Sequence, residues 1–262
     1  MARPIWKGAI SFGLVTIPVG LYAATEERRP KFNQLRKSDG SRIRYRKVAE
    51  TDGTEVSSDE IVKGYEIDKG RYVVFSDDEL QAALRSGAAG SIDVVQFVRS
   101  EEIDPIFYQK SYYLGPEKTG AKAYQILVRA LRDKGMVGLA RVAMRGREYP
   151  ATLRTDGEVV VLETMFWPDE IREPDFEELD TQIEVRDDEV KMAEMIIDNL
   201  TGPFDPTEWV DASRAAVEEL ARRKMEGEEI VSTAAPQPTG VVDLMEALKA
   251  SVEATKAKRK AG

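Results

Sequence analysis

Three arginines stand at every second position of the stretch SRIRYRKV, at Arg42, Arg44 and Arg46. If this stretch is a β-strand, the three arginines share one face, and Ile43 and Tyr45 share the other. The cations then stand about 7 Å apart and repel one another unless anions lie alongside. A nucleic-acid backbone supplies such a row of anions. Acidic side chains elsewhere in the same chain are the alternative source.

Basic residues gather around this stretch, although the whole chain of 262 residues has a formal net charge of -9. Residues 28–47 hold nine Lys or Arg and a single acidic residue, Asp39. Such segregation is typical of a nucleic-acid-binding face on an acidic body, and a solvated charged face is the alternative. The candidate nucleic-acid-binding residues are the basic residues of this region and of the C-terminal end: Lys31, Arg36, Lys37, Arg42, Arg44, Arg46, Lys256, Lys258, Arg259 and Lys260. Weaker candidates, whose strands can pack elsewhere, are Arg141, Arg145 and Arg147.

The composition lacks the residues on which many enzymes depend for catalysis. The sequence contains no Cys and no His, which excludes serine–histidine hydrolases, cysteine proteases and histidine-ligated zinc enzymes. The acidic pairs at 77–78 and 187–188 are expected at helix starts, where they meet the helix dipole favourably. The acidic residues between 169 and 180 lack the spacing of a metal-binding loop. We therefore expect no catalytic residue, no metal and no cofactor.

Short strands and tight turns predominate in the first two-thirds of the chain. A helix is expected at 77–85, where Ser76 and Glu79 have the spacing of a capping box, and another at 119–134. The segment 9–22 is β-rich, and its Gly13, Pro18 and Gly20 suggest bends or an edge. Strands are expected at 41–49, 71–75, 91–98, 106–114, 136–145, 147–155 and 158–167. This pattern predicts a mixed, β-dominated fold with a barrel or sandwich core and inserted helices.

The remainder of the chain reads as helices and a linker. Helices are expected at 187–200 and 206–225, and a further one, behind a Pro- and Thr-containing linker, at 240–253. That last helix has one apolar stripe, which fits docking on a partner or packing on the chain's own core equally well. The predicted organisation is a core at 1–186, a helical arm at 187–226, a linker at 227–239, and a tail helix with a basic extension at 240–262. The basic extension can touch DNA or simply solubilise the chain.

Targeting signals are not evident. The first apolar stretch is interrupted by Lys7 and has no cleavage pattern, and no apolar run reaches the length of a membrane span. A cytoplasmic protein is expected.

Long blocks of this sequence resemble the bacterial Ku family, in order and over nearly the whole chain. They include RPIWKGAISFGLVTIPVGLYAAT, SRIRYRKV, EIDPIFYQKSYYLGP, WPDEIREPDF and LTGPFDPTEWVDASRAAVEELARRKMEGEEI. The resemblance implies a Ku-type β-barrel with a C-terminal helical arm, and a homodimeric ring that threads onto double-stranded DNA ends without reading their sequence. It implies recruitment of DNA ligase D for non-homologous end joining, a nucleoid-associated cytoplasmic location and no enzymatic activity. The alternative is a DNA-compacting or nucleic-acid-processing β-barrel protein.

The resemblance also assigns roles. Arg42, Arg44 and Arg46 are expected to line the ring and bind phosphates, with Lys31, Arg36 and Lys37 extending that surface. Trp6 is expected to pack in the core rather than contact DNA. Many members of the family carry His and Cys where this chain has Asn33, Arg36, Asp39, Ala49 and Asp52. We therefore expect no zinc site, and turns held by hairpin chemistry alone.

Overall fold

The computed structural model describes residues 3–84, 90–144, 146–179 and 183–227. The chain divides into two compact units, one of Met1–Arg28 with Asn33–Glu173 and one of Arg29–Phe32 with Pro174–Gly262. The sequence-based domain boundaries stay predictions. The linker at 227–239 lies almost wholly outside the described residues, and the tail at 240–262, with its four basic candidates, lies entirely outside them.

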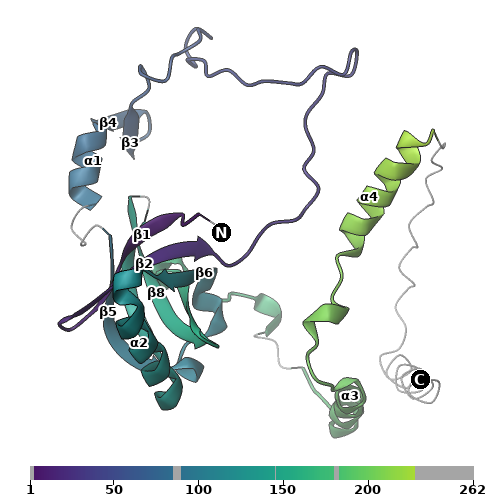
Figure 1. The fold of residues 1–262 in the computed structure, drawn as a ribbon. Coiled ribbons are helices and arrows are strands. Elements are labelled where there is room, and N and C mark those ends of the chain that lie inside the picture. The colour runs from purple at the N-terminus through teal and green to yellow at the C-terminus, as the bar shows by residue number, and fades with distance from the viewer. Residues whose placement is uncertain (1–2, 85–89, 145, 180–182, 228–262) are drawn as a thin grey trace. The chain divides into compact units, whose positions relative to one another are not determined.

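Seven strands of the first unit form a closed barrel in the order β1-β2-β6-β9-β8-β7-β5 (Figure 1). Neighbours pair antiparallel, except that β1 and β5 run parallel where the barrel closes. The strands are β1 (Trp6–Phe12), β2 (Val15–Ala23), β5 (Ser91–Arg99), β6 (Tyr108–Pro116), β7 (Met136–Met144), β8 (Arg147–Asp156) and β9 (Val159–Met165). The predicted β-dominated fold with a barrel core is confirmed.

Alternating apolar side chains fill the barrel. In β2, Ile17, Val19 and Leu21 are fully buried, and Val160 and Leu162 of β9 are as well. Inward-pointing residues at every second position are what a closed sheet requires. The continuous apolar run at 9–22 is divided between two strands because Gly13, at a φ of 58°, makes the turn between them.

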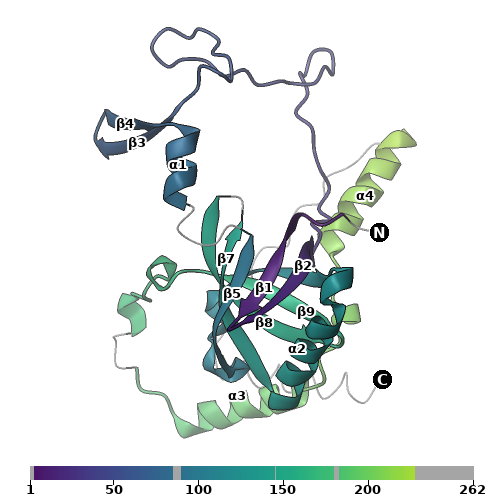
Figure 2. The ribbon, with the colours of Figure 1, turned by 60° about the vertical axis from the view of Figure 1, so that its left-hand side comes forward.

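Helix α2 (Ala121–Lys134) packs against β2, β7 and β8, beside the barrel in Figure 2. Its buried residues, Tyr124, Leu127, Val128 and Leu131, follow the three-and-four spacing of one helical face. The Tyr124 hydroxyl donates a hydrogen bond to the Leu114 carbonyl (2.6 Å) and accepts one from the Val160 amide (2.7 Å). Burial raises the pKa of Tyr124, so the hydroxyl stays protonated and able to donate. One side chain thus ties α2 to β6 and β9 together.

A separate hairpin joins β3 (Lys63–Asp68) to β4 (Arg71–Phe75) and leads into α1 (Asp77–Leu84). The Glu79 carboxylate accepts from the Ser76 amide and hydroxyl, and the Ser76 hydroxyl accepts from the Glu79 amide. The predicted capping box at this helix start is confirmed. Strand β3 was not among the predicted strands.

Two sequence-based predictions of secondary structure are wrong. Residues 41–49 form no strand: only isolated bridges at Leu35–Arg42 and Val48–Glu55 are present there, because the two ends of the stretch fold back on different loops. The helix expected at 206–225 begins at Ala212, because the Asp211 carboxylate caps it by accepting from the Arg214 amide.

The second unit contains α3 (Asp187–Leu200), with the predicted bounds, and α4 (Ala212–Met225). Asp187 and Asp188 lie in the first turn of α3, as predicted. Neither helix has a buried residue, and apolar side chains such as Ile197 and Leu200 are exposed. In the described residues, every helix is too short or too polar to cross a membrane.

Replacing Tyr124 by Phe should lower the free energy of unfolding by about 1–3 kcal/mol, because two buried backbone groups lose their partner. Urea unfolding followed by circular dichroism measures this. Tyr113→Phe is the matched control, because Tyr113 lies on β6 and its side chain is 40% exposed. This variant should unfold like the wild type. Equal stability of the two variants would mean that the Tyr124 hydroxyl does not tie the helix to the barrel.

Candidate nucleic-acid interface

The segment that carries the candidate arginines is built from two similar loops, a first loop at residues 34–43 and a second loop at 47–56. In the first loop, the Arg36 amide donates to the Ser41 carbonyl (2.8 Å) and the Ile43 amide to the Gln34 carbonyl (3.0 Å). These bonds bring the two ends of the loop together without a regular strand.

The second loop repeats the pattern thirteen residues later in the sequence. The Ala49 amide donates to the Thr54 carbonyl (2.8 Å), and the Val56 amide donates to the Lys47 carbonyl (2.9 Å). Two glycines with positive φ, Gly40 at 70° and Gly53 at 71°, occupy equivalent places in the two loops. The two loops are therefore copies of one backbone design.

An aspartate closes each loop. The Asp39 carboxylate accepts from the Ser41 amide (3.0 Å) and hydroxyl (2.8 Å), and Asp52 accepts from the Thr54 amide (3.1 Å) and hydroxyl (2.8 Å). These hydrogen bonds, led by the one from the backbone amide, lower the pKa of both carboxyl groups. The sequence signal was the repeated Asp-Gly followed by Ser or Thr.

The three arginines between the loops have different partners. The Arg42 guanidinium donates to the Asn33 amide oxygen (2.6 Å), which is neutral and leaves the charge of Arg42 uncompensated. Arg46 forms an ion pair with Glu55 (2.7 Å). Within the described residues, Arg44 has neither a hydrogen bond nor an ion pair to its side chain, and it is exposed.

The other basic candidates of this region are exposed as well. Arg36 forms an ion pair with Asp39 at 2.7 Å. Acidic side chains of the same chain therefore neutralise Arg36, as Glu55 does Arg46. Lys37 has no carboxylate partner in the part of the chain that the structure describes, and neither has Lys31. Lys31 belongs to the second unit, whereas the other candidates of this region belong to the first.

Apolar side chains accompany the arginines. Ile43 and Tyr45 are exposed, Tyr45 to 82%, and the Tyr45 hydroxyl donates to the Gln34 side chain. Because no strand forms, the prediction of a basic face opposite an apolar face does not hold in this structure. The interface is instead an irregular, fully exposed segment that offers both guanidinium groups and an aromatic ring.

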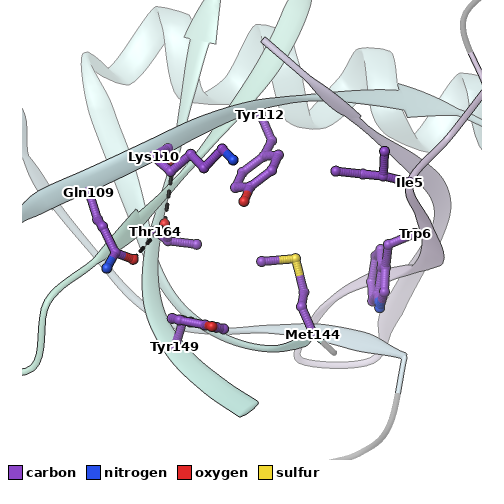
Figure 3. Close-up of a pocket in the computed structure, with 8 residues that line it drawn as sticks. All are labelled: Ile5, Trp6, Gln109, Lys110, Tyr112, Met144, Tyr149 and Thr164. Carbon is purple, nitrogen blue, oxygen red and sulfur yellow. Dashed lines mark hydrogen bonds between the residues drawn. The ribbon is translucent and has the colours of Figure 1, made fainter. Parts of the chain in front are cut away.

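The weaker candidates lie on the barrel. Arg141 of β7 and Arg147 of β8 are exposed, and Arg145 lies outside the described residues. Trp6 packs against the barrel core as predicted. It also lines a cavity of about 360 Å³ with Lys110 and Tyr112, which Figure 3 shows. Sequence reasoning missed this cavity, because its residues come from strands far apart in the chain.

The family model described as "Ku70/Ku80 beta-barrel domain" matches residues 11–192. The chain belongs to the Ku family. The match includes the two loops and their arginines, so these lie within the region by which the Ku family is recognised.

Curated relatives of the Ku family align with nearly the whole length of this chain. Proteins called "Non-homologous end joining protein Ku" are 50% identical in Frankia casuarinae, 44% in Desulfitobacterium hafniense and 40% in Bacillus subtilis. The alignments cover 98%, 97% and 96% of this chain. They cover 65% of the Frankia protein, 89% of the Desulfitobacterium protein and 82% of the Bacillus protein.

At the positions where many Ku-family members carry His and Cys, this chain has other residues. Arg36 and Asp39 form an ion pair in the first loop, and Ala49 and Asp52 take the equivalent places in the second. Over the described residues, no group of three or more His, Cys, Asp or Glu is placed to hold a metal ion. In this Ku-family chain, backbone and side-chain hydrogen bonds hold both loops, and the Arg36–Asp39 ion pair adds to the first.

The loops should respond to acid. Folding lowers the pKa of Asp39 and of Asp52. The stability that the two carboxylates give to the loops is therefore fully present above the ordinary pKa of 3.8, and it is lost as the pH falls through the lower pKa of the folded state. Amide hydrogen exchange of Ser41 and Thr54 by NMR should show the loops opening in that range. Asp39→Ala should open the first loop at neutral pH.

Ser38→Ala is the matched control, because within the described part of the chain the Ser38 hydroxyl has no hydrogen bond. An unchanged Ser41 exchange rate in Asp39→Ala would contradict the assigned role of the aspartate.

Proposed function

We propose that two copies of this chain form a ring that threads onto a double-stranded DNA end, binds it without reading sequence, and recruits DNA ligase D for non-homologous end joining. Membership of the Ku family supports a role in DNA-end binding. The observation that carries the proposal is the exposed segment at 42–46, in which Arg42 and Arg44 keep uncompensated positive charges. The protein acts as a scaffold rather than as an enzyme.

Charge distribution supports phosphate binding in particular. A guanidinium group binds phosphate oxygens with two donors, and such contacts carry no sequence information. A protein that must accept any broken end needs this kind of contact. The net acidity of the rest of the chain is compatible with it, because a ring needs positive charge only on its inner surface.

Exposed apolar side chains support self-association. The β3–β4 hairpin is an isolated two-stranded sheet, which is marginally stable in water without a packing partner. Tyr65 and Tyr72 of this hairpin are 66% and 60% exposed, and Val74 is exposed too. We propose that a second copy of the chain covers this hairpin in the homodimer.

The C-terminal part supplies the proposed contacts to the ligase. The apolar stripe of residues 240–253 suits docking on a partner protein, and the basic residues 256–260 suit flanking DNA. The proposed organisation is thus a core at 1–186, an arm at 187–226, a linker at 227–239 and a recruiting tail at 240–262. Binding to chromosomal DNA places the protein at the nucleoid, in the cytoplasm.

Gel shifts at several salt concentrations test threading. A duplex with open ends is compared with the same duplex closed by hairpins at both ends. Binding to the open duplex alone is expected, and the salt slope divided by about 0.9 estimates the number of phosphates engaged. Equal binding to both, or to closed circles, would identify a surface binder or a compacting protein instead.

The same assay tests the arginines. Arg42→Glu combined with Arg44→Glu should abolish end binding while the circular dichroism spectrum stays unchanged. The matched control is Lys122→Glu with Arg129→Glu on the exposed face of α2, which makes the same change in net charge. Full binding by the Arg42/Arg44 variant would remove this segment from the DNA path.

Arg44→Ala should reduce the salt slope more than Arg46→Ala, because Arg46 is paired with Glu55.

Tyr65→Asp combined with Val73→Asp should shift the protein from dimer to monomer, because these directly paired residues lie on one face of the hairpin. Sedimentation velocity measures the shift. Lys69→Asp at the hairpin turn is the control. A variant that remains dimeric would place the homodimer interface elsewhere.

A further inference from the structure

The mouth of the barrel contains a cavity of about 360 Å³ that the DNA-binding segment does not use (Figure 3). Its walls carry three aromatic side chains from three different strands, Trp6 of β1, Tyr112 of β6 and Tyr149 of β8. All three are partly buried and pack against the barrel core, so the fold holds them in place. Met144 of β7 also lines the cavity.

The charged and amide side chains of the lining come from one side of the cavity. Gln109 and Lys110 come from the start of β6, and Thr164 comes from β9, which pairs with it. The Lys110 ammonium lies 5.7 Å from the centre of the Tyr112 ring. Within the described residues Lys110 has no carboxylate partner. The cavity therefore combines aromatic walls, one side-chain amide and one cation without a counter-ion.

We propose that this cavity binds the unpaired terminal nucleotide of a DNA end, with the base against the aromatic rings and the phosphate at Lys110. The inference rests on the proposed function, because it needs a DNA end delivered to the barrel. Bases stack on aromatic side chains whatever their sequence, because every base has a π-face. This suits a protein that accepts any end.

The dimensions of the cavity favour a single nucleotide. Its volume is at the lower end of the range of ligand pockets, which runs from about 300 to 1,000 Å³. A closed barrel of this size has room for one small ligand and not for a duplex. The base must therefore be unpaired to enter.

The polar wall favours a nucleotide over an apolar protein side chain. An apolar side chain would fill the aromatic part of the cavity and leave the Lys110 ammonium without an anion, whereas the Gln109 amide oxygen already accepts from the Thr164 hydroxyl (3.4 Å). A nucleotide supplies both a phosphate for the ammonium group and polar base edges for the amide. Lys110 and Gln109 are exposed, and a polar group that loses water on binding without gaining a partner weakens the complex.

The cavity lies at the end of the barrel from which the chain continues into the basic segment. Strand β2 ends at Ala23, which pairs directly with Tyr112 of the cavity wall. The basic segment at 28–47 begins five residues further along the chain. The chain therefore enters its proposed phosphate-binding segment from the end of the barrel that holds the cavity.

Trp6 is a built-in reporter for this proposal. In a variant with Trp167→Phe and Trp209→Phe, Trp6 is the one tryptophan left in the sequence. The protein is titrated with a GC-rich blunt duplex and with the same duplex carrying one unpaired nucleotide at each end. We expect quenching of Trp6 fluorescence and about fivefold or tighter binding with the unpaired nucleotide only.

Substitutions in the cavity should remove the preference for the unpaired nucleotide and leave blunt-end binding unchanged. Lys110→Gln and Tyr149→Leu should do so, whereas the conservative variants Lys110→Arg and Tyr149→Phe should keep it. Thermal unfolding confirms that each variant folds. A preference that survives both Lys110→Gln and Tyr149→Leu would overturn the proposal.

The outcomes separate this proposal from the function on which it rests. Blunt-end binding without Trp6 quenching by the unpaired nucleotide would overturn the cavity proposal alone. Failure to bind either duplex would overturn both. Trp6 quenching by added DNA ligase D, and not by the unpaired nucleotide, would assign the cavity to a protein side chain and overturn the nucleotide proposal.

Discussion

Closure of the barrel by the parallel pair β1–β5 is the constraint on which the rest of the structure depends. Ala9, Ile10 and Ser11 pair with Ser91, Ile92 and Asp93, which joins the first strand of the barrel to the last in its order. A Cβ atom at Gly8 would lie 2.2 Å from the Gly90 carbonyl oxygen, so this close approach requires glycine. Closure removes the exposed strand edges on which sheets aggregate, and it encloses the apolar interior.

Outside the closed barrel, several segments bury nothing of their own. The β3–β4 hairpin and both C-terminal helices lack buried residues, and the two loops at 34–56 are held by polar hydrogen bonds rather than by a core. Binding residues on exposed segments carried by a stable scaffold are a common arrangement. Burying an unpaired guanidinium group costs free energy, and the basic segment accordingly lies outside the core.

The two loops show how a member of the Ku family can shape this region without cysteine or histidine. Each loop needs a residue that tolerates positive φ and a side chain that satisfies the exposed amides. Gly40 with Asp39 supplies both in the first loop, and Gly53 with Asp52 supplies both in the second. Arg36 and Arg46 then find acidic partners, while Arg42 and Arg44 remain available for anions outside the chain.

Local features of this protein were determined by the sequence itself. The capping box at Ser76, the bounds of α3 and the turn at Gly13 follow from short-range hydrogen bonding and backbone sterics, which neighbouring residues control. The resemblance to the Ku family, and the barrel core that it implies, could be recognised for the same reason: each block that carries the resemblance is a contiguous run of residues.

Only the tertiary structure decided which extended segments became strands and which side chains meet. Residues 41–49 alternate like a strand, yet no neighbour pairs with their centre, because a strand forms only where a second segment supplies hydrogen bonds. Closure through β1 and β5, and the meeting of Trp6, Lys110 and Tyr149 at the barrel mouth, join residues far apart in the chain. Alternation along a sequence predicts an extended backbone, but the register and partner of each strand come from the packing of the whole barrel.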